Sequence, residues 1–337
     1  MPVRHYLNNR VHGGEADMCP ATENKMKIYH NILEFKPVRN AVVTIGTFDG
    51  VHRGHQVILK DMVRKAHEIG GETVVVTFYP HPRQVLCIGD NSLRLISTQE
   101  EKIKQMDALD IDNLIVIKFT KEFSTLSSED FIRNYIVEKI KPAMLVIGYD
   151  HHFGNNRLGD FEMLNGLGAE NNFKVERVPV QDVDNVVVSS TKIRNALQTG
   201  DIRQANSLLG HQFSYTGIVV HGMGLGRQMG YPTANLEVAL EYRLIEKPGV
   251  YATFVDFDGK TLPAMTYIGR RPTVNDNRPA TIESHLIGFD GDLYGKQLTL
   301  RFVDRVRDEK RFDGLDELKR QINIDEQTII NILNKLS

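Results

Sequence analysis

The sequence predicts two domains of different class, an α/β domain with a parallel sheet followed by an antiparallel β-barrel. In the first half, short runs rich in Val and Ile alternate with stretches of helical spacing, which is typical of a parallel sheet with helices on both faces. In the second half, strand-like runs follow one another with turn residues between them, and no long helix intervenes. The length of 337 residues fits two domains of ordinary size.

Composition excludes several classes of protein. The chain has 41 basic and 43 acidic residues, so it lacks the positive surplus of a general nucleic-acid binder. Cys19 and Cys87 are too few for a disulfide framework or a cysteine zinc site. No apolar run approaches the roughly 18 residues that span a bilayer. We therefore expect a cytoplasmic protein with no nucleic-acid or membrane partner, and the sequence identifies no oligomeric partner.

The α/β half begins after a polar, aperiodic stretch. Residues 1–25 are predicted to be a disordered extension, and Met26 is the more natural start. The runs predicted to be buried strands are 41–45, 73–78, 114–119, 144–148 and 175–179. Between the first two runs, Ile58, Met62 and Ala66 recur at helical spacing, as do Phe131 and Tyr135 further on. In such sheets ligands bind beyond the carboxyl ends of the strands.

The second half reads as consecutive antiparallel strands and a helical tail. The predicted strands are 213–220, 250–255, 262–268, 281–286 and 297–303, with turn pairs such as Asp258-Gly259 between them. The tail from 315 to 336 has helical spacing with a break near 323–325, which predicts terminal helices. We place the boundary at 207–211, so the predicted domains are 26–207 and 212–337.

The first chemical motif is GTFDGVHRGH, which follows the first predicted strand. There the backbone turns and a helix begins near Gly54. A helix N-terminus offers unpaired N–H groups and a positive dipole end, which together hold phosphate. His52 and His55 are three residues apart, so both can face one phosphate chain and stabilise charge that develops there. The alternatives are a metal-binding His pair without a third ligand, and histidines that only cap the helix.

Two more segments supply groups at the same sheet edge. TFYPHPR follows the next strand and carries His81 and Arg83. VSSTKIR begins a later helix and presents hydroxyls with Lys192 and Arg194, a combination that can clamp a triphosphate. An ordinary Ser/Thr helix cap is the alternative for this segment.

These motifs together resemble the nucleotidyltransferase superfamily, and GYDHHFGNNRLGD with TFYPHPR resembles the FMN adenylyltransferase module of bacterial riboflavin kinase/FAD synthetases. The resemblance implies a Rossmann-like nucleotidyltransferase fold in which His52 and His55 contact the ATP phosphates and are catalytic. The other ATP-binding residues it implies are Gly46, Phe48, Asp49, Gly50, Ser190, Thr191 and Arg194. Those implied near the flavin or adenine are Pro80, His81, Arg83, Asp150, Phe153 and Gly154. His151-His152 and Lys192 depart from the usual pattern.

The second chemical motif is HGMGLGRQMGYPTAN. It is not a Walker A loop, because no Gly-Lys-Ser/Thr ends it. In an extended chain Thr233 and Asn235 point to the same side and present oxygen donors that suit Mg²⁺. A turn stabilised by its own Asn and Thr side chains is the alternative. Further on, TIESHLIGF contains Glu283, a carboxylate that could act near a reacting hydroxyl. The alternation of side chains along a strand leaves open whether Glu283 faces the barrel interior or solvent.

The segments GIVVHGMGLGRQMGYPTANL, YIGRRPT, TIESHL and DLYGKQLTLRFVDRVRDEKRF resemble, in this order, the riboflavin kinase pattern. The resemblance implies a riboflavin kinase-like barrel in which Thr233 and Asn235 hold Mg²⁺ with ATP, and Glu283 is the base for the 5′-hydroxyl of riboflavin. The other ATP-binding residues it implies are Gly222, Gly224, Gly226, Arg227 and Pro232. Tyr267 departs from the pattern, since asparagine is common at its position.

The resemblance implies a bifunctional enzyme of flavin cofactor synthesis. Its substrates would be riboflavin, FMN and ATP, and Mg²⁺ would act in both reactions. Two alternatives stay open. One is a nucleotidyltransferase that uses another phosphorylated acceptor. The other is a flavin-binding regulator that keeps the fold and has no catalytic activity.

Overall fold

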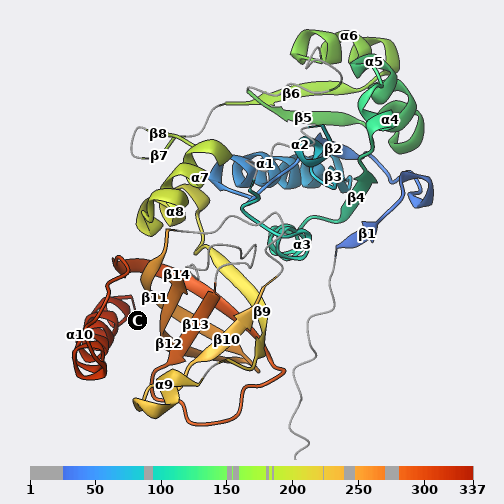
Figure 1. Cartoon of the computed structure of the whole chain (residues 1–337). Helices are drawn as coiled ribbons and strands as arrows, with labels where there is room; N and C mark the ends of the chain where they lie inside the picture. Colours follow the sequence, from blue (N-terminus) through green and yellow to red (C-terminus); the bar gives the residue numbers. More distant parts are fainter. Residues whose placement is uncertain are drawn as a thin grey trace, which may run out of the picture.

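The structure is a computed structural model. It describes residues 26–86, 94–149, 154, 159–179, 182–183, 186–222, 224–238, 247–269 and 281–336. In these residues a parallel sheet with its helices, here the sheet domain, precedes a closed barrel of strands β9 to β14 (Figure 1). The predicted disorder of residues 1–25 lies outside the described residues.

The prediction of a parallel α/β sheet is confirmed. The strands are β1 Lys27–Tyr29, β2 Val42–Ile45, β3 Thr73–Tyr79, β4 Asn113–Lys118, β5 Met144–Gly148 and β6 Lys174–Val178. They are parallel throughout and lie in the order β1-β4-β3-β2-β5-β6. From β2 the chain winds outward in both directions, so the crevice beyond β2 and β5 is where ligands bind in such sheets. The motif at Gly46 begins at that crevice.

Helices cover both faces of the sheet. Successive residues of each strand point to opposite faces, and apolar residues lie on both. Val42 and Val75 pack with α1 Arg53–Ile69 and α3 Gln99–Asp107. Val43 and Val74 pack on the other face. The helices of that face are η1 Ile32–Glu34, α5 Ser128–Phe131, the π-helix η2 Ile132–Ile140 and α6 Phe161–Asn171. Two short helices, α2 Pro82–Leu86 and α4 Lys121–Ser124, follow β3 and β4.

The prediction of an antiparallel barrel is also confirmed. Its strands are β9 Ser214–Val220, β10 Ala234–Glu237, β11 Gly249–Phe257, β12 Lys260–Gly269, β13 Thr281–Leu286 and β14 Gln297–Arg307. They close in the order β10-β13-β12-β11-β14-β9. The interior is apolar except for a buried hydrogen-bonded row, in which the Thr266 hydroxyl lies 2.7 Å from that of Thr253 and 3.0 Å from that of Ser284. Helix α9 Leu225–Gln228 interrupts the connection from β9 to β10.

The C-terminal tail forms one helix, α10 Leu315–Leu333, so the predicted break near 323–325 is wrong. Asp325 interrupts the apolar pattern of that segment. In the structure Asp325 is 2% exposed and accepts a 2.8 Å hydrogen bond from Nε of Arg307 on β14. The polar residue thus lies on the buried face of a continuous helix, because an arginine of the barrel pairs with it.

Two helices join the sheet domain to the barrel. α7 Ser190–Thr199 and α8 Ile202–Leu209 share one apolar cluster with the barrel interior, and a hairpin of β7 Asp182–Val183 and β8 Val186–Val187 precedes them (Figure 1). Asn206 of α8 donates a 2.8 Å hydrogen bond to the carbonyl of Phe302 on β14. Helices before the predicted boundary therefore pack on the barrel that follows it.

Candidate active sites

The first candidate site lies where the loop after β2 enters α1. His52 is the N-cap of α1, and its Nδ1 accepts the backbone N–H of His55 at 3.4 Å. Since Nδ1 is an acceptor, the ring proton is on Nε2. The rings of His52 and His55 stack with centroids 3.6 Å apart. The structure therefore brings the two predicted histidines together at the helix N-terminus.

Both histidines are neutral at physiological pH. Burial is the main cause that lowers the pKa of His52 to about 4, against the opposing influence of Asp49. Burial, followed by the charges of His52 and Lys102, lowers the pKa of His55 well below its ordinary value. Their contribution to a phosphate site is therefore an N–H donor rather than a positive charge. Phe48 packs its ring edge on His55 at 5.1 Å. His55 Nδ1 is buried and has no hydrogen-bond partner in the described part of the chain.

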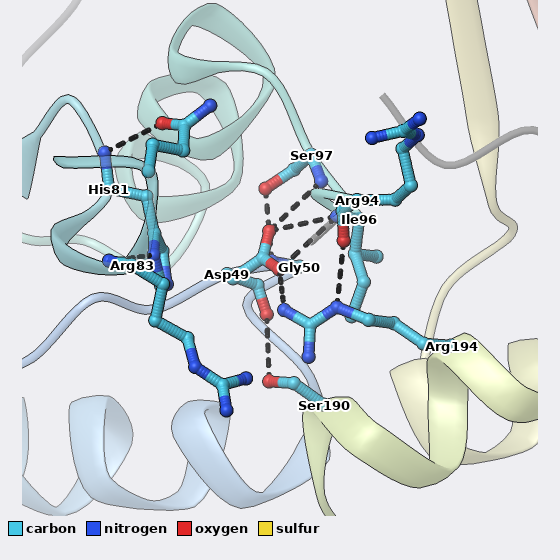
Figure 2. Close-up of polar contacts among 10 residues, drawn as sticks. Asp49, Gly50, His81, Arg83, Arg94, Ile96, Ser97, Ser190 and Arg194 are labelled. Carbon is cyan, nitrogen blue, oxygen red and sulfur yellow. Dashed lines mark hydrogen bonds and ion pairs between the residues drawn. The ribbon is translucent and has the colours of Figure 1, made fainter. Parts of the chain in front are cut away.

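Asp49 lies at the centre of a network that joins this loop to α7 (Figure 2). Its carboxylate accepts the backbone N–H of Ile96 at 3.0 Å and that of Ser97 at 3.2 Å, and it forms an ion pair with Arg194. Nε of Arg194 donates to the carbonyl of Arg94 at 2.8 Å. The carboxylate of Asp49 thus points into the protein, where it orients the arginine that was predicted to close over ATP.

The remaining predicted ATP-binding residues lie around this network. Ser190 Oγ donates to the Asp49 carbonyl at 3.4 Å, and Thr191 is exposed on the first turn of α7. Gly50 has φ +78°, and a Cβ there would lie 2.7 Å from the Ile96 side chain, so both conformation and space require glycine. Gly46 directly follows β2, and a Cβ there would lie 3.0 Å from the ring of Phe48.

Replacing Asp49 with Ala is expected to destabilise the protein by about 3–5 kcal/mol, because the change leaves the largely buried charge of Arg194 without its carboxylate partner and removes the acceptor of two amides. Urea unfolding followed by circular dichroism measures this loss. Asp49→Asn keeps one acceptor oxygen and should lose less stability. A free energy of unfolding within about 0.5 kcal/mol of the wild type for Asp49→Ala would contradict the network's importance.

The loop after β3 places a third histidine at the same edge. His81 Nδ1 accepts the backbone N–H of Arg83 at 3.2 Å, which again leaves the proton on Nε2. Burial, the largest of several influences, lowers the pKa of His81 to about 4. Pro80 is half-buried beside it, and Arg83 is exposed. Gly154 is exposed, whereas Asp150, Phe153 and the departures His151-His152 lie outside the described residues.

One charged residue near this site, Lys102, was not predicted from the sequence. Lys102 on α3 is only 6% exposed. Among the described residues, Asp49 is the one acidic group that influences its pKa. In the sequence its only signal is its position four residues before Met106, on the apolar stripe of a helix that is rich in charged residues.

The second candidate site lies on the outer face of the barrel. Asn235 on β10 is directly opposite Glu283 on β13, and Thr233 Oγ1 lies 3.5 Å from Glu283 Oε2. Ala234 and Ile282, which directly precede Asn235 and Glu283 on their strands, are buried in the barrel interior. Glu283 therefore points outward, which answers the question that strand alternation left open. The structure brings the three predicted kinase residues together.

The glycine-containing loop lies beside these side chains. A Cβ at Gly222 would lie 2.2 Å from the Asn235 amide nitrogen, so the backbone approaches this side chain closely. Gly224 is the N-cap of α9, and Gly226 lies within α9. A cavity of about 280 Å³ opens next to them. Its lining includes Arg227, Pro232, Thr233, Phe289, Asp292 and Tyr294.

Two neighbours of Glu283 were not assigned roles from sequence. His285 Nδ1 is 2.8 Å from the carbonyl of Pro232, and its Nε2 is 3.6 Å from Glu326 of α10. It therefore ties the segment that carries Thr233 to the C-terminal helix. Tyr267 lies directly opposite Glu283 on β12 and donates to Glu309. Burial, followed by Glu309, raises the pKa of Tyr267, so its hydroxyl stays protonated.

Comparison with known proteins matches each half of the chain to a family model. Residues 35–192 match the family model of FAD synthetase, and residues 209–333 match that of riboflavin kinase. A bifunctional riboflavin kinase/FMN adenylyltransferase of Pseudomonas fluorescens is 38% identical over 301 residues, which cover 89% of this chain and 96% of that protein. The chain belongs to this bifunctional family.

One further relative and one solved structure are similar to most of this chain. The family member of Escherichia coli K12 is 36% identical over 300 residues, covering 89% of this chain and 94% of its own. A crystal structure named as a macrolide-efflux protein of Streptococcus pneumoniae is 28% identical, with a TM-score of 0.83, and covers 91% of this chain and 99% of its own. Among the described residues, no helix has the length and apolar character needed to cross a membrane.

Proposed function

We propose that the chain converts riboflavin to FMN on the barrel and FMN to FAD on the sheet domain, and that each reaction consumes one ATP. The observation that supports this proposal is the presence of two separate groups of side chains, each suited to phosphate, in one member of the bifunctional family. One is the histidine pair at the N-terminus of α1. The other is the cluster of Thr233, Asn235 and Glu283. We assign the first to residues 26–207 and the second to residues 212–337.

In the kinase reaction Glu283 accepts the proton of the riboflavin 5′-hydroxyl as that oxygen attacks the γ-phosphorus of ATP. The bond from this phosphorus to the β–γ bridging oxygen breaks, and ADP leaves. The hydroxyl and amide oxygens of Thr233 and Asn235 fit Mg²⁺, which prefers hard oxygen ligands and retains phosphate and water ligands. Bound Mg²⁺ would neutralise charge on the phosphate chain. Arg227, which lines the adjoining cavity, supports binding of the triphosphate there.

In the adenylyl transfer, the FMN phosphate attacks the α-phosphorus of ATP and pyrophosphate leaves. The attacking phosphate is already anionic, so this step needs no general base. The amides at the start of α1 and the Nε2–H groups of His52 and His81 can donate to the phosphate oxygens as charge develops. Arg194, which Asp49 holds in place, supplies a fixed positive charge beside them.

A chromatographic time course of riboflavin with MgATP tests the proposal. FMN should appear first and then decline as FAD accumulates. Accumulation of FMN without FAD, even when other phosphorylated acceptors are converted, would favour a nucleotidyltransferase with another acceptor. Binding of riboflavin with no turnover would favour a flavin-binding regulator without catalytic activity.

Removal of divalent metal with EDTA is expected to stop FMN formation, because the γ-phosphate then lacks the cation that offsets its charge. In Thr233→Val, which is nearly isosteric, the Mg²⁺ concentration for half-maximal kinase rate should rise about tenfold. Titration of both proteins with Mg²⁺ at saturating ATP measures this. An unchanged Mg²⁺ requirement in Thr233→Val would remove Thr233 from the proposed ligands.

The proposed substrates also bear on location and partners. ATP, riboflavin and FMN are small cytoplasmic molecules, and the balanced charge of the chain gives no support for a nucleic-acid partner. We infer a cytoplasmic enzyme whose partners are these small molecules.

A further inference from the structure

Lys102 is a buried cation that contacts no counter-ion in the part of the chain that the structure describes. It lies in the first half of α3, and only 6% of its surface is exposed. Within the described ranges, its ammonium makes no hydrogen bond and no ion pair. A buried charge is costly unless it is paired. No paired group therefore compensates for the burial of this lysine, unless an anion binds there.

The groups around Lys102 come from the elements that form the first candidate site. Asp49 of the loop after β2, His55 of α1 and His81 of the loop after β3 each interact electrostatically with its ammonium. Asp49 is the nearby carboxylate, but it already accepts two backbone amides and pairs with Arg194. The negative charge of Asp49 is therefore mainly offset by these two amides and Arg194 rather than by Lys102.

Two observations point to a ligand at this place rather than to a structural role. His55 Nδ1, on the neighbouring helix, is also buried without a partner among the described residues. Side chains on a helix incline toward its N-terminus, so Lys102 extends toward the sheet edge at which α1 and α3 begin. An unpartnered imidazole nitrogen and a cation at the same edge of the sheet are suited to an anion with several oxygens.

We propose that the ammonium of Lys102 binds the pyrophosphate portion of ATP during FAD formation. This inference rests on the adenylyl transfer proposed above. In that step the bond between the α-phosphorus and its bridging oxygen breaks, and the electron pair stays on the departing pyrophosphate. The protonated Lys102 stabilises this growing negative charge by hydrogen bonding to it. Lys102 thus contacts the leaving group and takes no proton.

In the free protein the buried charge of Lys102 lowers the stability of the fold. This effect on stability can be tested independently of catalysis. Burial is the main cause that lowers the pKa of Lys102, to about 8, while Asp49 acts in the opposite direction. Below pH 8 the folded protein therefore holds an unfavourable charge. Lys102→Met, which keeps length and apolar character, should have a Tm equal to or above that of the wild type at pH 7. A structural lysine would give a lower Tm.

The main experiment compares Lys102→Met with Lys104→Met, an exposed position on the same helix. Lys102→Met should lower kcat/KM for FAD formation from FMN by about 100-fold. Calorimetric titration should show at least tenfold weaker binding of inorganic pyrophosphate. Riboflavin phosphorylation on the barrel should stay within twofold of wild type in both variants. Unchanged pyrophosphate affinity in a folded Lys102→Met would overturn the proposal.

The Lys102→Arg variant supplies a pH test. In the wild type, pyrophosphate affinity should fall as pH rises above about 8, because the ammonium loses its proton in the free protein. His52 and His81 have pKa values of about 4, so they are neutral throughout this range. Arginine stays protonated, so Lys102→Arg should retain measurable affinity without this alkaline decline. The same decline in both proteins would contradict the assignment.

These outcomes separate the inference from the proposed function. If the wild type forms no FAD, adenylyl transfer itself is wrong, whatever the variants do. If the wild type forms FAD and Lys102→Met forms it at the same rate, only the role of Lys102 is wrong.

Discussion

Replacing Glu283 with Gln is expected to lower riboflavin phosphorylation by about 10²–10⁴-fold, the usual contribution of a positioned general base. Gln has nearly the same shape, so the contact with Thr233 and the pairing of β13 with β10 should persist. What is lost is the oxygen that accepts the proton of the 5′-hydroxyl. The rate of FMN formation at saturating riboflavin and MgATP measures the loss.

The same protein preparation supplies the internal control. FAD formation from supplied FMN should stay within twofold of wild type, because the sheet domain carries its own site. Glu237→Gln is a matched surface control, since Glu237 is exposed on β10 two residues after Asn235. A Glu283→Gln protein that phosphorylates riboflavin normally would exclude Glu283 as the base. Equal loss of both activities would argue against independent sites.

The fold was largely predictable because local patterns agree with it. The Val- and Ile-rich runs of β2 to β5 are buried on both faces, and such runs are readable without knowledge of the partners. β1 escaped prediction because it has only three residues at the sheet edge. The continuity of α10 was not predicted, because the burial of Asp325 in a helix depends on its pairing with Arg307, which lies on β14.

The candidate sites were predictable where one motif carries several groups, as at His52 and His55. They were not predictable where a side chain depends on distant parts of the chain. The pairing of Asp49 with Arg194 joins residues 145 positions apart. The outward direction of Glu283 follows from the closure of the barrel, and the burial of Lys102 follows from the packing of α3 beside α1. None of these three facts can be read from the spacing of residues in the sequence.

Replacing both His52 and His55 with Ala is expected to reduce FAD formation by about 10³-fold or more, since two donors to the phosphate chain are removed together. The pathway should then stop at FMN, while riboflavin phosphorylation continues. His52 also caps α1 through Nδ1, so the double variant loses about 1 kcal/mol of stability as well. Chromatography of products from riboflavin and MgATP measures the arrest at FMN.

His52→Asn separates the two roles of this side chain. Asn is a strong N-cap and can accept the His55 amide, so the helix start should survive. It has no group in place of Nε2–H, so FAD formation should still fall by about 10²-fold. Normal FAD formation by a folded His52→Asn protein would assign His52 to capping alone.

The pH profile tests whether His52 acts as a neutral donor. Its pKa of about 4 means that the wild type should show no inflection in FAD formation near pH 6.5, and activity should decline only as pH approaches 4. Protonation there charges Nδ1, which can then no longer accept the His55 amide, so the cap and the donor geometry are lost together. The unfolded chain takes up this proton near pH 6.5, so stability should also decrease below that pH. An inflection near 6.5 that disappears in His52→Asn would instead show that His52 changes its charge in the working range, as a histidine acting through its positive charge would.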